Sequence, residues 1–152
     1  MLVGKNGTGK THISAAIANE LIKDKVPVIF GTLTDLLNKC GESYGKNSKY
    51  SEYKIMDLYT KVDLLIIDDL GMERMNEWML SKLFYIVNGR LLRELPIIIT
   101  TNYELDNLRK RLSNPNKNCE TTNSIISRLY SMCYRVECLG KDYRIKAGDE
   151  NE

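Results

Sequence analysis

A glycine-rich segment at residues 4–11 constrains this chain more than any other feature. It follows the apolar pair Leu2-Val3 and precedes a helical pattern, and it matches Gly-x-x-x-x-Gly-Lys-Thr at every fixed position: Gly4, Lys5, Asn6, Gly7, Thr8, Gly9, Lys10 and Thr11. Glycines permit positive φ, so backbone N–H groups can turn inward around phosphate oxygens. The helix that follows presents its positive end to the same oxygens. We therefore expect Lys10 to neutralise phosphate charge and the Thr11 hydroxyl to hold Mg²⁺.

The rest of the chain alternates short apolar runs with helical patterns. Strands are predicted at residues 2–3, 26–30, 64–67, 96–102 and 134–138, and helices at 34–40, 52–60, 76–92 and 124–133. A further amphipathic helix is predicted from Ile13, Ile17 and Leu21, which recur every fourth residue. Residues 41–51 are predicted to form a loop, residues 107–122 are polar, and the tail after Gly140 is predicted to fray. This alternation is typical of an α/β fold around a parallel sheet.

Polar side chains follow two of the predicted buried strands. Asp68-Asp69 comes after a run of four apolar residues, and Asn102 follows the strand that begins at Ile97. Ligands bind at the carboxyl edge of open α/β sheets, so we expect Asp68 to hold Mg²⁺ through water and Asp69 to polarise an attacking water. Asn102 is expected to hold that water or to touch the γ-phosphate. The alternatives are a solvated aspartate pair and an amide that only satisfies its own loop.

Composition excludes several classes of protein. The chain has 152 residues and a net charge of +2, which fits one domain and is less basic than is usual for a DNA-coating protein. No apolar run approaches the roughly 18 residues that cross a bilayer, so no membrane role is expected. Four cysteines without a Cys-x-x-Cys pair predict reduced thiols and a cytoplasmic location.

The order of these motifs resembles the AAA+ domain, a branch of the ASCE P-loop ATPases. In detail the chain is similar to the bacterial helicase loaders of the DnaC/DnaI type and to the IstB transposition helper. Four stretches carry the resemblance: residues 7–12 through His12, residues 64–73 through Asp68-Asp69-Leu70-Gly71-Met72-Glu73, residues 98–103 through Asn102, and residues 124–129 through Arg128.

The resemblance implies a fold and roles for these residues. The fold is a three-layer αβα P-loop NTPase with a parallel five-stranded sheet in the order 5-1-4-3-2, and the cofactors are ATP and Mg²⁺. Residues 4–11 correspond to Walker A and bind ATP together with His12, and Asp68-Asp69 corresponds to Walker B. Asn102 corresponds to sensor 1, Arg128 to a finger arginine that completes a neighbouring subunit's site, and Arg144 to sensor 2. An arginine at position 128 that only solvates a helix face, and an Arg144 in a solvated tail, are the alternatives.

Two departures from that pattern matter. Asp69 stands where many AAA+ enzymes have glutamate, which predicts slow hydrolysis, with Glu73 as a possible substitute. Because only three residues precede Gly4, we expect a shortened first strand and an AAA+ core at residues 1–145 that lacks an upstream module, followed by a charged tail at 146–152. The features for helicase docking and part of the adenine pocket are therefore expected to be missing from this chain.

Three functions fit these observations. The first is a loader of a replicative DNA helicase that also contacts single-stranded DNA and self-assembles through Arg128. The second is an IstB-like transposition helper, and the third is a non-catalytic nucleotide-binding module. A metabolite kinase is disfavoured because no arginine-rich lid is present. Contact with DNA is assigned to the cluster Arg109-Lys110-Arg111 with Lys117, and a solvated basic loop is the alternative.

Overall fold

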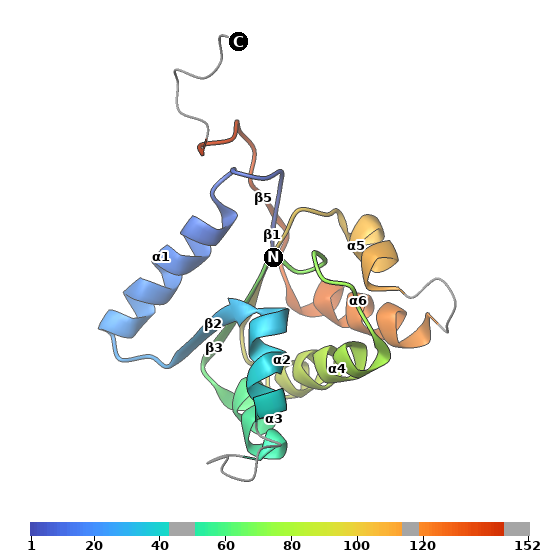
Figure 1. Ribbon diagram of the computed structural model, residues 1–152. Coiled ribbons are helices and arrows are strands. Elements are labelled where there is room, and N and C mark those ends of the chain that lie inside the picture. Colours follow the sequence, from blue (N-terminus) through green and yellow to red (C-terminus); the bar gives the residue numbers. More distant parts are fainter. Residues whose placement is uncertain (43–50, 114–118, 145–152) are drawn as a thin grey trace.

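The computed structural model describes residues 1–42, 51–113 and 119–144 of the chain (Figure 1). Its strands are β1 (Leu2–Val3), β2 (Val28–Thr32), β3 (Leu64–Asp68), β4 (Ile97–Thr101) and β5 (Val136–Glu137). Its helices are α1 (Lys10–Lys23), α2 (Leu33–Glu42), α3 (Glu52–Lys61), α4 (Glu77–Leu92), α5 (Leu105–Leu112) and α6 (Glu120–Met132).

The strands form one parallel sheet in the order β2-β3-β4-β1-β5, which confirms the predicted order. β4 lies between β1, which precedes the glycine-rich loop, and β3, which ends at Asp68. Leu2 pairs with Thr100, and Ile67 pairs with Ile99. The carboxyl ends of β1, β3 and β4 therefore meet at one edge of the sheet, where open α/β folds bind ligands.

Helices cover both faces of the sheet. α1 lies on one side and α4, α5 and α6 lie on the other (Figure 1). Alternate residues of β3 divide between the two layers: Leu65 and Ile67 join the core formed with α2 to α6, whereas Leu64 and Ile66 pack in the smaller core with α1. This two-sided burial explains why β3 is a continuous apolar run.

α1 forms where it was predicted, but of its apolar stripe only Leu21 packs against the sheet among the described residues. Ile13 and Ile17 are 41% and 38% exposed, whereas Ser14 and Ala18 are buried. Small side chains on the buried face let a helix approach the strands closely, and the large residues of the sheet fill the remaining space. The helix was thus predicted correctly, but Ile13 and Ile17 of the pattern that predicted it do not mark its buried face.

Other element boundaries differ from the predicted ones. β2 begins two residues later than expected and runs to Thr32. The Thr32 hydroxyl caps α2, because it accepts from the Asp35 N–H (3.1 Å) and donates to the Asp35 carboxylate (2.7 Å). Two helices occupy part of the polar stretch 107–122: α5 ends at Leu112 and α6 begins at Glu120. Residues 43–50, most of the predicted loop, and Lys117 lie outside the described residues.

Two general expectations concern the described part of the chain. The four cysteines lie within it and form no disulfide there. None of the helices in that part combines the length and the apolar character that a membrane crossing requires.

Candidate functional site

The glycine-rich loop connects β1 to α1 through two left-handed residues. Gly7 has φ +75° and Gly9 has φ +89°, a region that favours glycine because side chains with a Cβ are strained there. Gly9 caps α1 without a side-chain hydrogen bond. The first amides of α1 and the positive end of its dipole are thus presented to the loop, which is the arrangement that binds phosphate.

Lys10 is the first residue of α1 and is only 5% exposed. Its ammonium group donates to the carbonyl oxygens of Gly4 (2.9 Å) and Lys5 (2.8 Å). Burial lowers the pKa of Lys10, and the negative charge of Asp69 opposes that shift. The loop therefore holds a buried cation whose desolvation an anionic ligand would offset.

Asp68 lies at the carboxyl end of β3 and contacts Thr11, 57 residues earlier in the chain. The Thr11 hydroxyl lies 3.1 and 3.0 Å from the two carboxylate oxygens, and the Thr100 hydroxyl donates to Oδ1 at 2.6 Å. The carboxylate is 8% exposed. Two threonine hydroxyls from different elements thus fix its orientation beside the loop.

Asp69 and Asn102 extend the site along the same sheet edge. Asp69 has φ +54°, and its N–H donates to the Thr100 hydroxyl at 2.8 Å. The Asn102 amide nitrogen lies 3.8 Å from the Met72 sulfur. Its Oδ1 is buried and has no hydrogen-bond partner among the described residues. A buried amide oxygen without a partner at this edge is suited to accept from a water or ligand group.

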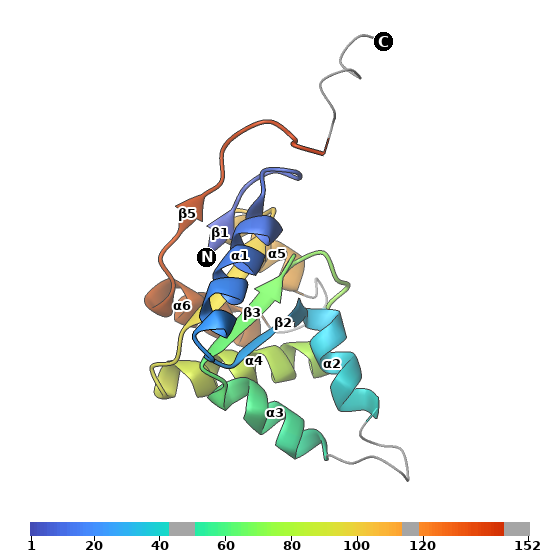
Figure 2. The same cartoon turned by 90° about the vertical axis from the view of Figure 1, so that its left-hand side faces the viewer.

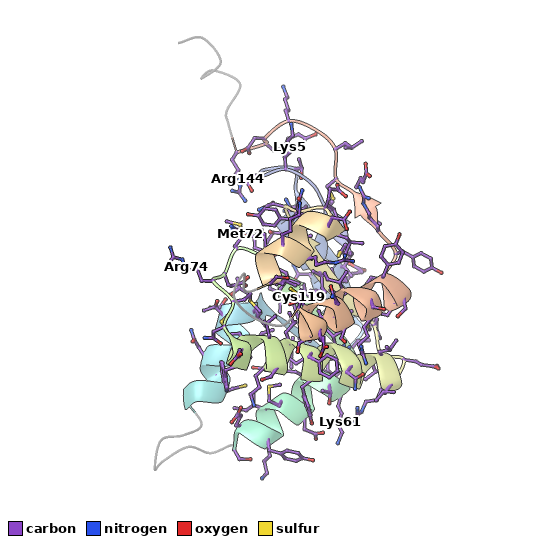
Figure 3. The ribbon with its side chains drawn as sticks, turned by 90° about the vertical axis from the view of Figure 1, so that its right-hand side faces the viewer. Lys5, Lys61, Met72, Arg74, Cys119 and Arg144 are labelled. Atoms are coloured by element: carbon purple, nitrogen blue, oxygen red, sulfur yellow. The ribbon has the colours of Figure 1, made fainter. Side chains whose placement is uncertain are left out.

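These residues line one cavity of about 960 Å³. Its wall comes from the glycine-rich loop, from the start of α1, and from the ends of β3 and β4: Asn6, Gly7, Thr8, Gly9, Lys10, Thr11, His12, Ile13, Ala15, Asp69, Met72, Asn102, Tyr143 and Arg144. Gly4, Lys5 and Asp68 are outside this lining. In Figure 3, Lys5, Arg144 and Met72 lie toward one end of the molecule and Lys61 toward the other.

The segment after β5 was predicted to fray, and for Lys141–Arg144 that prediction is wrong. Cys138 N–H donates to the Val3 carbonyl (2.7 Å), and Tyr143 N–H donates to the Gly7 carbonyl (3.1 Å). We call residues 138–144 the strap, because they run past the start of α1 and close over the loop (Figure 2). Charge and a glycine suggested a frayed tail, but one backbone hydrogen bond to β1 and one to the loop hold it.

Arg128 occupies a different place from the rest of the predicted site. Its Nε donates to Asn88 Oδ1 (2.9 Å), its Nη1 donates to the Ser124 carbonyl (3.0 Å), and its guanidinium lies 4.7 Å from the Phe84 ring centroid. Arg128 therefore joins α6 to α4 and does not line the cavity of its own chain. A role at a neighbouring subunit's site stays a prediction.

Glu73 does not line the cavity either. Its Oε2 accepts from the Gly71 N–H at 3.1 Å, and burial raises the pKa of this carboxyl. Three residues that the sequence reasoning missed contribute to the site instead: Thr100, Met72 and Tyr143. The Thr100-Thr101-Asn102 triplet drew attention to Asn102 only, because no sequence pattern shows which hydroxyl faces a neighbouring strand.

The donor set fits a magnesium nucleotide. The described residues contain no cluster of three or more His, Cys, Asp or Glu that would cage a metal by itself. Mg²⁺ is usually held by one or two protein oxygens together with phosphate oxygens and water. Thr11 and Asp68 supply such oxygens beside a loop built for phosphate, and the buried Lys10 supplies the matching positive charge.

Comparisons with known proteins agree with this geometry. The family described as IstB-like ATP binding protein matches residues 1–151. The replicative helicase loader DnaC of Escherichia coli K12 is 32% identical over 109 residues, which cover 72% of this chain and 44% of DnaC. The phage-like element PBSX protein XkdC of Bacillus subtilis is 29% identical over 156 residues, covering 95% of this chain and 52% of XkdC. The chain thus spans about half or less of the length of these two relatives.

Solved structures show the same fold. The crystal structure of DnaI has a TM-score of 0.74 and 30% identity, and the match covers 93% of this chain and 70% of DnaI. DnaA from Aquifex aeolicus, solved with AMPPCP bound, has a TM-score of 0.74 and 27% identity over 94% of this chain and 41% of DnaA. The strand order, the phosphate loop beside a buried aspartate, and these matches lead to one conclusion: the chain belongs to the family of IstB-like ATP binding proteins and has the AAA+ fold of the DnaC and DnaI helicase loaders.

Proposed function

We propose that this chain is an ATP-binding and ATP-hydrolysing switch domain that acts in loading a replicative DNA helicase. One observation carries the proposal: the glycine-rich loop, the buried Lys10 and the Thr11–Asp68 pair converge at one sheet edge. The similarity to DnaC, a replicative helicase loader, favours this role within the AAA+ proteins.

Each residue of the site has a distinct task in this proposal. The loop amides and Lys10 bind the phosphate oxygens, and Thr11 with Asp68 holds Mg²⁺, which when bound neutralises charge on the phosphates. Asp69 orients the attacking water, and the unpartnered Asn102 oxygen accepts a hydrogen bond from it. Asp69 is one methylene shorter than glutamate, so hydrolysis is slow, as suits a switch.

Binding and turnover are tested separately. We expect wild-type protein to bind Mg-ATP and Lys10→Ala to bind it at least about tenfold more weakly, because a buried charge-assisted contact is lost. Asp69→Asn should keep wild-type affinity and lose phosphate release. Calorimetric titration and a phosphate-release assay, with and without single-stranded DNA, measure these quantities. Equal affinity in wild type and Lys10→Ala contradicts the proposal, and binding without any turnover supports a non-catalytic nucleotide-binding module.

A transposition helper ATPase is the second candidate, and the family match over residues 1–151 favours it. A solved DnaA complex contains single-stranded DNA, so nucleic-acid form is the relevant difference to test. Filter binding of this chain with ATP to single-stranded and duplex DNA distinguishes the two roles. Preference for single strands supports the loader, and preference for duplex supports the transposition helper.

A further inference from the structure

The basic cluster on α5 divides between two environments. All three residues are exposed, and Arg109 and Lys110 line a second, open cavity. Arg111 turns toward the end of β3: its Nε donates to the Gly71 carbonyl at 3.1 Å, and its guanidinium lies 5.1 Å from the centroid of the Tyr103 ring. DNA contact by these three residues stays a prediction, and Arg111 in addition contacts the segment that follows Asp69.

Both backbone polar groups of Gly71 are hydrogen-bonded, and neighbouring side chains leave no room for a Cβ. Its φ is +98°, and a Cβ at this position would overlap the side chain of Leu108 and press on the Tyr103 ring. Its N–H donates to the Glu73 carboxylate, and its carbonyl accepts from Arg111. The arginine is thus the partner of the one polar group of Gly71 that the loop itself does not satisfy.

Only Leu70 separates Gly71 from Asp69, and it is fully buried. Its N–H donates to the Thr100 carbonyl (2.9 Å), and its carbonyl accepts from the Thr101 hydroxyl (2.7 Å). Arg111 therefore holds a residue that a short, rigid connection joins to Asp69. We expect a displacement of Gly71 to displace Asp69 by a similar amount.

Asp69 needs that support because its backbone lies in the left-handed region, at φ +54°. Residues other than glycine persist there only when the surrounding structure fixes them. β4 fixes the amino side of Asp69 through the Thr100 hydroxyl. On the carboxyl side, Leu70 is held to β4, and Arg111 holds the next residue, Gly71; Asp69 itself lines the cavity.

We propose that Arg111 is a positioning residue for ATP hydrolysis: by holding the Gly71 carbonyl against α5, it keeps the Asp69 carboxylate aimed into the nucleotide cavity. This inference rests on the proposed ATPase function. It places Arg111 outside the cavity lining and outside direct contact with nucleotide. Arg111 therefore affects the hydrolysis step and leaves the affinity for ATP unchanged.

The test compares Arg111→Ala with Arg93→Ala. Arg93 is a matched control, because its Nη1 donates to the carbonyl of another glycine, Gly89, at 3.0 Å, and neither residue is part of the cavity. We expect Arg111→Ala to lower kcat by about tenfold, since small displacements of a catalytic group are costly, and to leave the Kd for Mg-ATP within about twofold. Arg111→Lys should recover part of kcat, because an ammonium can still donate to the carbonyl but cannot lie flat on Tyr103.

Hydrogen exchange supplies a readout that does not depend on activity. In Arg111→Ala the amides of residues 70–73 should exchange faster than in wild type, while those of β3 stay protected; Arg93→Ala should change neither. If Arg111→Ala does not fold, the same measurements are made on Arg111→Gln. A wild-type kcat together with unchanged hydrogen exchange in that variant overturns the proposal. Wild-type protein without turnover contradicts the proposed function instead, and unchanged exchange at residues 70–73 then still overturns the positioning role.

Discussion

At the scale of single residues, Gly7 meets two separate demands. Its φ of +75° disfavours any residue with a Cβ, and the place of that Cβ is already taken by the Asp142 carboxylate. Gly9 meets only the first demand, because a Cβ there would meet nothing within 4 Å. The pair therefore separates the effect of backbone conformation from the effect of contact with the strap.

Gly7→Ala should weaken Mg-ATP binding by more than the backbone strain of an alanine at positive φ alone would cause. A non-glycine residue in the left-handed region costs roughly 1 kcal/mol, equivalent to about fivefold in affinity, and the overlap with Asp142 adds to that cost. The double variant Gly7→Ala with Asp142→Ala should recover the part due to overlap. Titration calorimetry measures the affinities, and a double variant as weak as Gly7→Ala alone would contradict a contact effect.

Residue patterns predicted part of the site and missed the rest for a physical reason. Lys10, Thr11 and Asp68 were predictable because phosphate and Mg²⁺ require those chemical groups at those spacings. The Thr100 hydroxyl that orients Asp68 was not predicted, because its contact depends on the pairing of β3 with β4. The hydrogen bond from Arg111 to Gly71 was not predicted, since a helix directs adjacent side chains to different faces.

At the scale of elements, Arg90 joins α4 to three other segments of the chain. Nη1 donates to the carbonyls of Tyr59 and Val62, both at 2.9 Å, and Nη2 donates to those of Asp63 and Pro96. The side chain is fully buried, and burial lowers the pKa of Arg90 to about 10. The end of α3 and the entries to β3 and β4 are thus held together by one guanidinium.

Arg90→Met should lower the free energy of unfolding by about 3 kcal/mol, because it fills similar volume but leaves buried carbonyls without donors. Urea denaturation followed by circular dichroism measures the change. Lys61→Ala is the control: it removes a largely exposed ion pair with Asp57 and should cost less than about 1 kcal/mol. An effect of Arg90→Met no larger than that of the control would refute the stabilising role.

Elements with strong apolar patterns were predicted well, and weakly patterned ones were not. β3 and α4 lie within a residue of their predicted bounds. α5 was missed because five of its eight residues are charged or amide side chains, so only Leu108 and Leu112 indicate its buried face. The orientation of α1 was missed because periodicity does not show that Ser14 and Ala18 are preferred where a helix approaches a sheet closely.

At the scale of the whole molecule, Arg128 faces away from its own cavity and toward α4. If Arg128 left Asn88 and Phe84 to serve a neighbouring subunit, these intramolecular contacts would compete with the assembly. The strand order was predictable from the family resemblance, but this competition was not, because it depends on how α6 packs on α4.

Turnover per molecule should therefore rise with protein concentration if Arg128 acts between subunits. Arg128→Ala should remove that rise, so that its kcat at high protein concentration is at least about tenfold below that of wild type. Finger arginines raise kcat by that much or more. Asn88→Ala, which releases one contact of Arg128, should move the rise to lower concentration. Phosphate release across a dilution series, with sedimentation velocity alongside, measures both effects. A specific activity independent of concentration in all three proteins would exclude a role in trans.

Because β1 has only two residues, its pairing with β5 determines where thermal unfolding of the domain begins. β5 pairs with Leu2 and Val3 and donates one backbone hydrogen bond to Met1, and its own residues are exposed. This seam is the weakest in the sheet, so its outer strand detaches first and takes with it the strap that rests on Gly7. On heating, ATP binding would consequently be lost at a lower temperature than helical structure. Bound ATP would stabilise the pairing of β5 with β1.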